Sequence, residues 1–197
     1  MKKLKVTIIG YGGMGSFHAK LIQANPEVEV HGIFDILESR QQAGEADGYS
    51  AYVSLEEALD DETVDAILIA TPNDVHKEIA AQALEAGKHV ICEKPVTLNS
   101  EELSEIMHTA KEHERVFMVH QNRRWDSDFQ MVKDLYENRK IGEVFHIESR
   151  VQGANGIPGD WRHLKAHGGG MLLDWGVHLL DQLLYMIESP LAKVAAD

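Results

Sequence analysis

Short apolar runs alternate along the first part of the chain with segments whose apolar residues recur at helical spacing. The runs, rich in valine and isoleucine, cover residues 4–9, 28–34, 64–70, 89–92 and 116–119. The helical segments between them cover residues 14–24, 36–46, 74–85 and 100–114. Near-continuous apolar strands that alternate with helices are typical of a parallel sheet covered on both faces. The pattern therefore predicts an α/β fold with a doubly wound parallel sheet.

Three residues mark ends of the predicted helices. Asn73 and Asn99 directly precede helical segments, where an asparagine side chain can accept a hydrogen bond from a free backbone N–H group. Gly87 follows the segment 74–85, at a position where a helix often ends in a left-handed residue. These signals support the boundaries that the apolar periodicity gives.

The pattern changes after residue 119. A polar, basic stretch is followed by a predicted helix at 127–138, a strand-like run at 143–151, a Gly/Pro loop at 153–159 and an apolar helix at 171–186. One strand is too little sheet to bury so apolar a helix. We therefore expect a first domain at 1–119 and the incomplete start of an α/β second domain at 120–197, completed by further sequence or by another chain.

Composition removes several classes of function. The chain has 197 residues and a formal net charge of −13, which disfavours a protein that tracks nucleic-acid phosphates. No apolar run approaches the roughly 18 residues of a membrane span. The basic start soon meets glycines, which disfavours an export signal. A single cysteine, Cys92, excludes a disulfide framework within the chain and makes a reducing, cytoplasmic setting the expectation.

A glycine-rich loop follows the first predicted strand and opens the first helix. It fits G-x-G-x-x-G and consists of Gly10, Tyr11, Gly12, Gly13, Met14 and Gly15. Gly10 permits the tight turn, Gly12 lets the backbone approach a pyrophosphate, and Gly15 lets helix and strand pack closely. The N–H groups at the helix start would then bind the phosphates. The alternative, a glycine-rich turn without a ligand, explains neither the flanking elements nor the acid described next.

Asp35 ends the second predicted strand, 20 residues beyond Gly15. An acid at this point can accept hydrogen bonds from both hydroxyl groups of an adenosine ribose. It would also repel the 2′-phosphate that distinguishes NADP. The sequence therefore predicts a dinucleotide site that favours NAD over NADP.

Further motifs give the sequence a resemblance to the glucose–fructose oxidoreductase / inositol dehydrogenase (Gfo/Idh/MocA) family. Besides the glycine loop, they are Thr71-Pro72-Asn73 with His76, Glu93-Lys94-Pro95, Asn122-Arg123-Arg124, Trp161-Arg162, and the segment GGGMLLDWGVHLLD from Gly168 to Asp181. The resemblance covers the whole chain but only the first half or so of the family's usual length. It implies a Rossmann domain followed by an α/β domain with a large open sheet, which in the family usually also forms a homo-oligomer interface.

The resemblance also implies catalytic roles for three residues. Lys94 would contact the reacting oxygen of the substrate, His178 would be its acid/base, and Asp174 would stand beside that imidazole. From the residues alone, Lys94 could be a solvated lysine, and Asp174 and His178 could be a pair on a helix surface, since they are four residues apart. An ammonium stabilises alkoxide charge, and a carboxylate can fix an imidazole tautomer.

Weaker assignments follow from the same resemblance. Thr71, Asn73, His76 and Glu93 would line the cofactor, although Asn73 is equally explained as a helix cap. Arg123, Trp161 and Arg162 would contact a polyol, or merely shape a surface loop. His163, His167, Asp174 and His178 could be read as metal ligands, but their spacing is not H-E-x-x-H, and we expect no metal.

The resemblance implies an NAD-dependent dehydrogenase acting on a secondary alcohol of a sugar, inositol or related polyol. A second possibility is a glycosidase in which tightly held NAD oxidises and re-reduces the sugar. A third is a cofactor-binding regulator that has lost catalysis. We expect a small-molecule substrate and neither a nucleic-acid nor a membrane partner.

Overall fold

The computed structural model describes residues 2–153 and 159–195. The chain divides into two compact units. The first unit comprises Met1–His120 together with Ala166–Gly168, and the second comprises Gln121–Lys165 and Gly169–Asp197.

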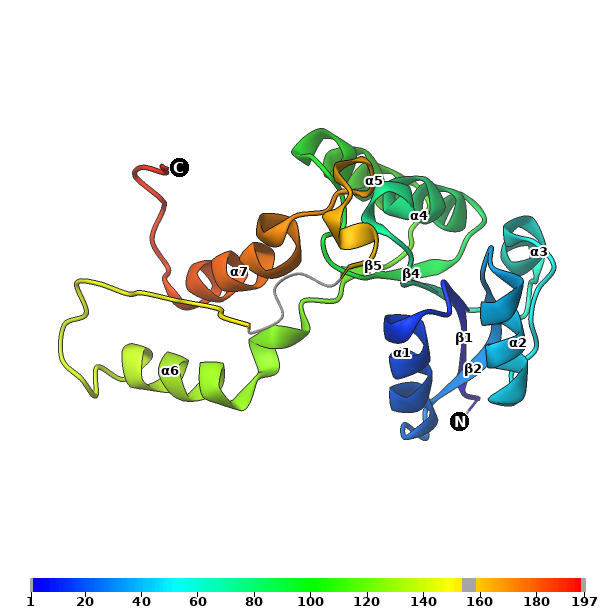
Figure 1. Ribbon diagram of the computed structural model, residues 1–197, viewed down its shortest axis with the longest axis horizontal. Coiled ribbons are helices and arrows are strands. Elements are labelled where there is room, and N and C mark those ends of the chain that lie inside the picture. Colours follow the sequence, from blue (N-terminus) through cyan, green and yellow to red (C-terminus); the bar gives the residue numbers. More distant parts are fainter. Residues whose placement is uncertain (1, 154–158, 196–197) are drawn as a thin grey trace. The chain divides into compact units, whose positions relative to one another are not determined.

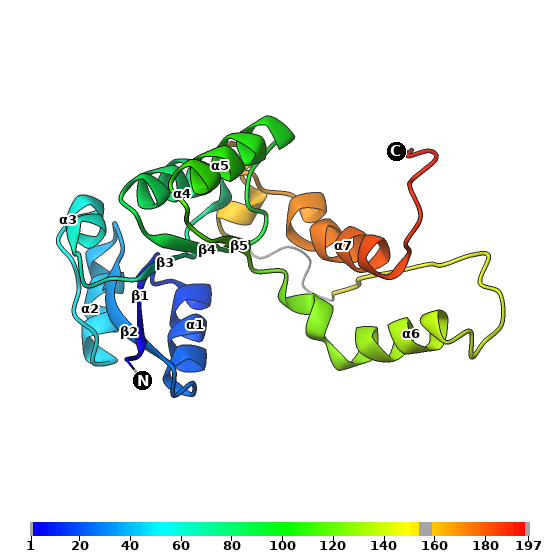
Figure 2. The same cartoon turned by 180° about the vertical axis from the view of Figure 1, so that it is seen from behind.

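The first unit is built on a five-stranded parallel sheet of order β2-β1-β3-β4-β5. Its strands are β1 (Leu4–Ile9), β2 (Val28–Phe34), β3 (Ala66–Ile69), β4 (His89–Cys92) and β5 (Phe117–Val119). Figure 2 shows β3, β4 and β5 side by side in this order. Three of the strands have the predicted bounds, and the other two are shorter by one to three residues, so the predicted doubly wound sheet is confirmed.

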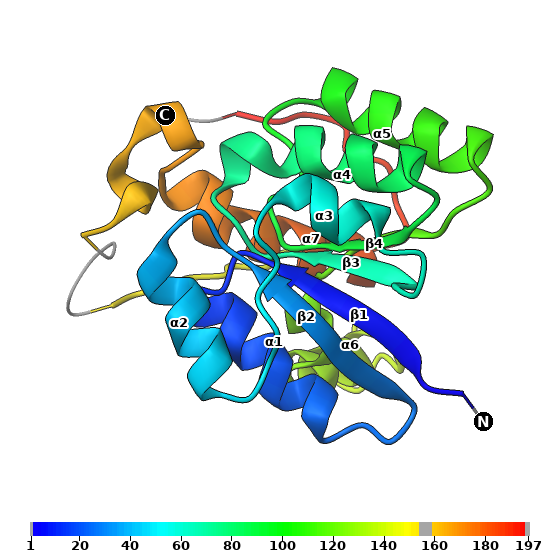
Figure 3. The ribbon, with the colours of Figure 1, turned by 90° about the vertical axis from the view of Figure 1, so that its right-hand side faces the viewer.

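Helices cover both faces of this sheet (Figure 3). One face carries α1 (Gly13–Gln23) and α2 (Glu38–Ala46), and the other carries α3 (Leu55–Asp60), α4 (His76–Glu85) and α5 (Ser100–Glu112). Successive strand residues supply the two cores, because side chains alternate between faces. Ile8 thus packs in the cluster that contains Ala19 of α1, and Ile9 packs in the opposite cluster with α4 and α5.

Two predicted helix ends are confirmed. The Asn99 side chain accepts a hydrogen bond from the backbone N–H of Glu102 and so caps α5. Gly87, just after α4, has a φ of +76°, the left-handed conformation that a glycine adopts without strain.

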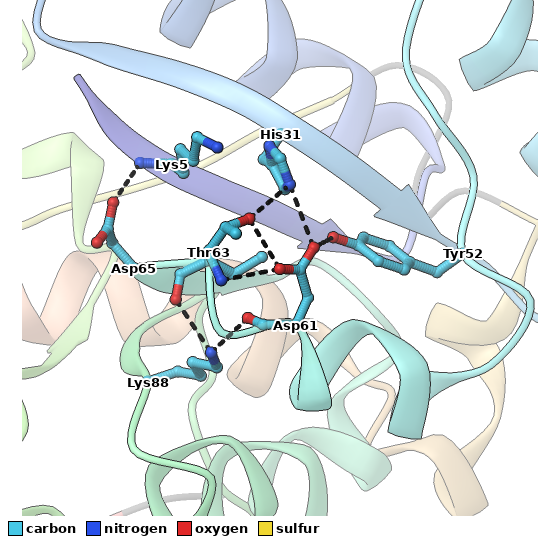
Figure 4. Close-up of polar contacts among 8 residues, drawn as sticks. Lys5, His31, Tyr52, Asp61, Thr63, Asp65 and Lys88 are labelled. Carbon is cyan, nitrogen blue, oxygen red and sulfur yellow. Dashed lines mark hydrogen bonds and ion pairs between the residues drawn. The ribbon is translucent and has the colours of Figure 1, made fainter. Parts of the chain in front are cut away.

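A polar network lies near the amino ends of β1, β3 and β4 (Figure 4). The carboxylate of Asp61 accepts hydrogen bonds from the Tyr52 hydroxyl at 2.7 Å and from the Thr63 hydroxyl and N–H at 2.7 and 2.8 Å. The His31 ring lies 3.2 Å away. The Tyr52 bond and then those from Thr63 lower the pKa of Asp61, while burial and the bond to Asp61 raise the pKa of Tyr52 to about 12.

Lys88 completes this network from the loop before β4. Its ammonium group donates to the backbone carbonyls of Asp61 at 2.6 Å and Val64 at 3.1 Å, and the residue is only 6% exposed. The neighbouring Asp65 carboxylate accepts the backbone N–H of Lys5 at 2.8 Å (Figure 4). These bonds tie the loop before β3 to the starts of β1 and β4, so the network is structural.

The second unit contains helices α6 (Ser127–Glu137) and α7 (Val177–Met186), drawn in green and orange in Figure 1. The predicted strand at 143–151 is wrong: residues 143–151 form no strand, and Phe145 is 98% exposed. Apolar alternation alone does not make a strand, because the backbone needs a partner edge, and the described residues of this unit supply none. No helix within the described ranges combines the length and apolarity needed to cross a membrane.

The predicted helix at 171–186 has the predicted bounds, but residues 172–176 are not α-helical. Leu172–Gly176 forms a π-helical turn that continues into α7. Such turns insert one extra residue and occur frequently at functional sites. This turn contains Asp174 and therefore alters the helical register that the sequence predicted between Asp174 and His178.

Candidate functional site

The glycine loop between β1 and α1 has the geometry of a phosphate-binding turn. Gly10 has a φ of +92°, and a Cβ atom there would lie 2.8 Å from the carbonyl carbon and oxygen of Ala70. At Gly15 a Cβ atom would lie 2.0 Å from the Gly10 oxygen. At Gly12, by contrast, a Cβ atom would meet no described atom within 4 Å. Two glycines are thus required by the fold itself, while Gly12 leaves the start of α1 open to a ligand, as a pyrophosphate requires.

Asp35, at the end of β2, is held against this loop. One carboxylate oxygen accepts the backbone N–H of Tyr11 at 2.8 Å, and the other accepts that of Leu37 at 2.9 Å. The Gln41 side chain also donates to the Asp35 carbonyl at 2.7 Å. Each carboxylate oxygen keeps acceptor capacity beyond one such bond. The acid is therefore fixed beside the loop and can still accept hydroxyl groups.

The turns after β3 and β4 are joined by a buried histidine. The ring nitrogens of His76 lie 2.9 Å from the carbonyl oxygens of Thr71 and Pro95, and the ring is fully buried. Burial lowers the pKa of His76 despite these carbonyls, and a neutral imidazole donates to only one of them at a time. His76 is thus placed to hold the two turns together.

Thr71 and Asn73 differ in what they leave available. The Thr71 hydroxyl oxygen is buried and has no hydrogen-bond partner among the described residues. The Asn73 amide donates to the carbonyl of Gly168 at 2.9 Å and is buried. The alternative that Asn73 caps a helix is wrong: the chain begins a short 3₁₀ turn at Asn73–Val75, and its side chain accepts no capping bond there. Thr71 is thus the better placed of the two to contact a ligand.

Glu93, at the end of β4, lies between two imidazoles. Its Oε1 atom is 2.7 Å from His18 Nε2 and 3.0 Å from His120 Nδ1, and the carboxylate is 8% exposed. Burial by itself would raise the pKa of Glu93, but the bonds from His120 and His18 outweigh it and lower the pKa to about 2. The carboxylate is therefore ionised at neutral pH and committed to its protein partners.

Lys94 follows directly. Its backbone N–H donates to the second oxygen of Glu93 at 3.2 Å, and the peptide bond between Lys94 and Pro95 is cis. The residue stands at the carboxyl edge of the parallel sheet, where open α/β folds bind ligands.

In the second unit, Asp174 and His178 lie among aromatic and guanidinium groups. The Asp174 carboxylate is 3.7 Å from Arg162 Nε, and the Trp175 and His178 ring centroids are 5.9 Å apart. The Arg123 guanidinium stacks over Trp175 at 4.3 Å, and His178 is 4% exposed. Arg123 and His178 are thus connected through Trp175, a residue that no motif of the sequence marks, while Asp174 and Arg162 form a separate pair.

Two glycines shape the approach to the π-helical turn. A Cβ atom at Gly169 would lie 2.3 Å from the carbonyl oxygen of Arg162, so the backbones touch there. The Gly170 N–H donates to the same oxygen at 2.9 Å. The guanidinium of Arg162 also stacks on Trp161 at 4.5 Å. Gly169 and Gly170 thus fix the Trp161-Arg162 segment against the start of the helix that carries Asp174.

Comparison with known proteins identifies the chain. Residues 4–121 match the family described as "Oxidoreductase family, NAD-binding Rossmann fold" (GFO_IDH_MocA), and residues 129–197 match the GFO/IDH/MocA C-terminal domain. The chain belongs to the Gfo/Idh/MocA family.

Solved and curated proteins agree with this membership. A crystal structure of an NAD-binding protein from Listeria innocua is 63% identical with a TM-score of 0.94, over 95% of this chain and 56% of that one. GenD2 from gentamicin A biosynthesis, in complex with NAD, is 30% identical with a TM-score of 0.86, over 96% and 55%. scyllo-Inositol 2-dehydrogenase (NADP(+)) IolW of Bacillus subtilis (strain 168) is 32% identical over 98% of this chain and 54% of its own. The chain spans about half the length of the curated relatives it matches.

The sequence analysis of this Gfo/Idh/MocA chain did not name His18 and His120. A signal was present: Gly15, His18 and Ala19 form the buried face of α1, so His18 points at the sheet. Strand alternation places Glu93 and His120 on the face that Ile91 and Met118 share. The helical and strand periodicities together thus predict that the side chains of His18, Glu93 and His120 lie on the same side of the sheet.

Proposed function

We propose that the protein transfers a hydride between a nicotinamide dinucleotide and a secondary alcohol of a sugar, inositol or related polyol. The observation that carries the proposal is the loop geometry: Gly12 leaves the start of α1 open, and Asp35 is fixed beside it with acceptor capacity to spare. Asp35 favours NAD over NADP, because its charge opposes a 2′-phosphate. The NADP(+) named for the Bacillus relative makes this preference the first point to test.

The residues present fit such a cofactor. The N–H groups at the start of α1 would bind the pyrophosphate, Asp35 the ribose hydroxyls, and the Thr71 hydroxyl the nicotinamide half. The remaining loop residues Tyr11, Gly13 and Met14, together with Asn73, His76 and Lys94, are the further predicted cofactor neighbours, whereas the Glu93 carboxylate is bonded to His18 and His120. The bound cofactor would supply the hydride acceptor or donor.

Three side chains would act on the substrate itself. The Lys94 ammonium stabilises negative charge on the alcohol oxygen as the hydroxyl group loses its proton. The His178 imidazole accepts that proton in oxidation and returns it in reduction. Asp174 stabilises the imidazolium, and its own charge is moderated by Arg162 at 3.7 Å.

The polyol class is supported by the surroundings of Asp174 and His178. Arg123, Trp161 and Arg162 offer guanidinium donors and aromatic surface, which suit a ligand with many hydroxyl groups. The inositol named for the Bacillus relative belongs to that class. We propose a small polyhydroxy compound as substrate.

The test is NADH formation by the purified protein at its full natural length against a panel of inositols and sugars. We expect NAD reduction with at least one polyol, and Lys94→Ala should lower kcat at least 100-fold with NAD affinity within twofold. Lys77→Ala is the control, because Lys77 is a half-buried lysine paired with the exposed Glu105. Unchanged turnover in Lys94→Ala would refute the role of Lys94. Cleavage of a glycoside without net NADH would indicate the glycosidase instead.

A further inference from the structure

Glu93 forms a buried cluster with His18 and His120 that the chemistry proposed above does not use. One carboxylate oxygen receives both imidazoles, His18 at 2.7 Å and His120 at 3.0 Å. The two rings meet edge to face with centroids 4.6 Å apart. The His18 and Glu93 side chains are less than a tenth exposed, and His120 is 22% exposed. Buried charge-assisted hydrogen bonds of this kind hold their partners in one geometry.

The three members come from three separate elements of the first unit. His18 lies on α1, whose first turn is the candidate pyrophosphate site, whereas Glu93 and His120 follow β4 and β5. The backbone already links the two strand ends, since the His120 N–H donates to the Cys92 carbonyl at 2.8 Å. The carboxylate of Glu93 adds the link to α1.

Lys94 is held through both of its chain neighbours. Before it, the second oxygen of Glu93 accepts the Lys94 N–H at 3.2 Å. After it, the Pro95 carbonyl lies 2.9 Å from His76 Nδ1. Three buried or half-buried histidines thus restrain the turn that carries Lys94.

We propose that Glu93, held by His18 and His120, is a positioning residue that fixes Lys94 relative to the cofactor helix α1. The proposal rests on the proposed function, which gives Lys94 its task. A charged group that stabilises a reacting oxygen must keep its place within about half an ångström, which requires support from neighbouring side chains. Glu93 supplies that support without touching the substrate.

The hydrogen bonds of the cluster determine which nitrogen of each imidazole ring carries a proton. Glu93 is ionised and only accepts, so His18 must carry a proton on Nε2 and His120 must carry one on Nδ1. One ring nitrogen of each histidine and one carboxylate oxygen of Glu93 also lie within 4.8 Å of one another, a spacing that could hold a metal ion. A bound zinc ion would replace these N–H protons, so the two arrangements are distinguishable by experiment.

The decisive variant is Glu93→Gln. An amide oxygen can still accept from both histidines, but the amide NH₂ group must then face the Lys94 N–H, donor against donor. The turn should shift while the core stays intact. The matched control is Glu112→Gln on α5, because Glu112 forms an exposed pair with His108 at 3.3 Å.

We expect Glu93→Gln to lower kcat at least tenfold, with the NAD dissociation constant and the polyol KM within about twofold of the unaltered protein. The control should leave all three unchanged. Long-range ¹H–¹⁵N spectra of the histidine rings supply a readout that does not depend on turnover. In the unaltered protein they should show a proton on His18 Nε2 and on His120 Nδ1, even if the variant fails to fold.

Three results would overturn the proposal. They are an unchanged kcat in Glu93→Gln when Lys94→Ala is inactive, a His120 ring without a proton on Nδ1, and stoichiometric zinc in the purified protein. A Lys94→Ala variant with normal turnover would instead refute the proposed function, and the ring spectra would still report on the cluster.

Discussion

The Asp35 carboxylate accepts the backbone N–H of Tyr11 at 2.8 Å, across 24 residues of chain. Tyr11 belongs to the glycine loop, so the loop that would bind the phosphates also orients the acid that would bind the ribose. This hydrogen bond therefore links the two parts of the candidate cofactor site directly.

Replacing Asp35 with serine should weaken NAD binding about tenfold and reduce or reverse the discrimination against NADP. The reason is the loss of both an acceptor for the ribose hydroxyls and the charge that opposes a 2′-phosphate. Fluorescence titration with both cofactors measures the effect. Asp47→Asn is the control, because Asp47 accepts the Tyr11 hydroxyl rather than its backbone. Tighter binding of NADP than NAD by the unaltered protein would contradict the role of Asp35.

Alanine at Gly12 and alanine at Gly15 should separate binding from folding. At Gly12 a Cβ atom meets no described atom within 4 Å, so the melting temperature should stay within a few degrees while NAD affinity falls at least tenfold. At Gly15 the Cβ atom would lie 2.0 Å from the Gly10 oxygen, which should cost about 3 kcal/mol of stability. Calorimetry and cofactor titration of both variants test this. Normal NAD affinity in the Gly12 variant would contradict the assignment of the start of α1 as the pyrophosphate site.

Lys88→Met should destabilise the first unit by about 2 kcal/mol, because two carbonyl oxygens would lose their buried donor. Those carbonyls belong to Asp61 and Val64 (Figure 4). Urea unfolding measures the change. Lys111→Met on the exposed side of α5 is the control and should stay within about 0.5 kcal/mol. Equal stabilities for the two variants would show that the network around Lys88 contributes nothing.

Stability should fall at both ends of the pH scale through Asp61 and Tyr52. Folding lowers the pKa of Asp61, so its contribution is complete above its ordinary value near 4 and is lost as the pH falls below it. Folding raises the pKa of Tyr52 to about 12, so its contribution is complete below pH 10 and is lost between pH 10 and 12. In Tyr52→Phe the alkaline loss should shrink. Urea unfolding from pH 3 to 11 measures both, and equal alkaline slopes would contradict the assignment.

The sequence predicted the sheet well and the polar contacts poorly, for a physical reason. The strand at residues 4–9 and the end of α4 at Gly87 follow from local patterns, namely an apolar run and a residue that tolerates positive φ. The strand expected at 143–151 failed because pairing depends on a neighbouring edge, which local alternation does not reveal. The cap expected of Asn73 failed because Asn73 is itself the first residue of a 3₁₀ turn, and its amide donates instead to Gly168, a residue 95 positions away.

The candidate site shows the same division. Gly10, Gly15 and Asp35 could be assigned from spacing, since the loop, the helix start and the next strand end lie within one short stretch. The cluster of His18, Glu93 and His120 joins three stretches, so its members stand out only once helix and strand faces are compared. The π-helical turn at Leu172–Gly176 inserts a residue without any marker in the apolar pattern.

The bond between Asn73 and Gly168 has a practical consequence for anyone who wishes to isolate the nucleotide-binding half. By packing, residues 166–168 belong with residues 1–120, so this half is assembled from two separate pieces of sequence. A fragment that ends at His120 would lack the Gly168 carbonyl, which accepts the Asn73 amide. It would also lack the Gly168 backbone, against which the Leu98 side chain packs. Such a fragment should be less stable and more prone to aggregate than one that also contains residues 166–168.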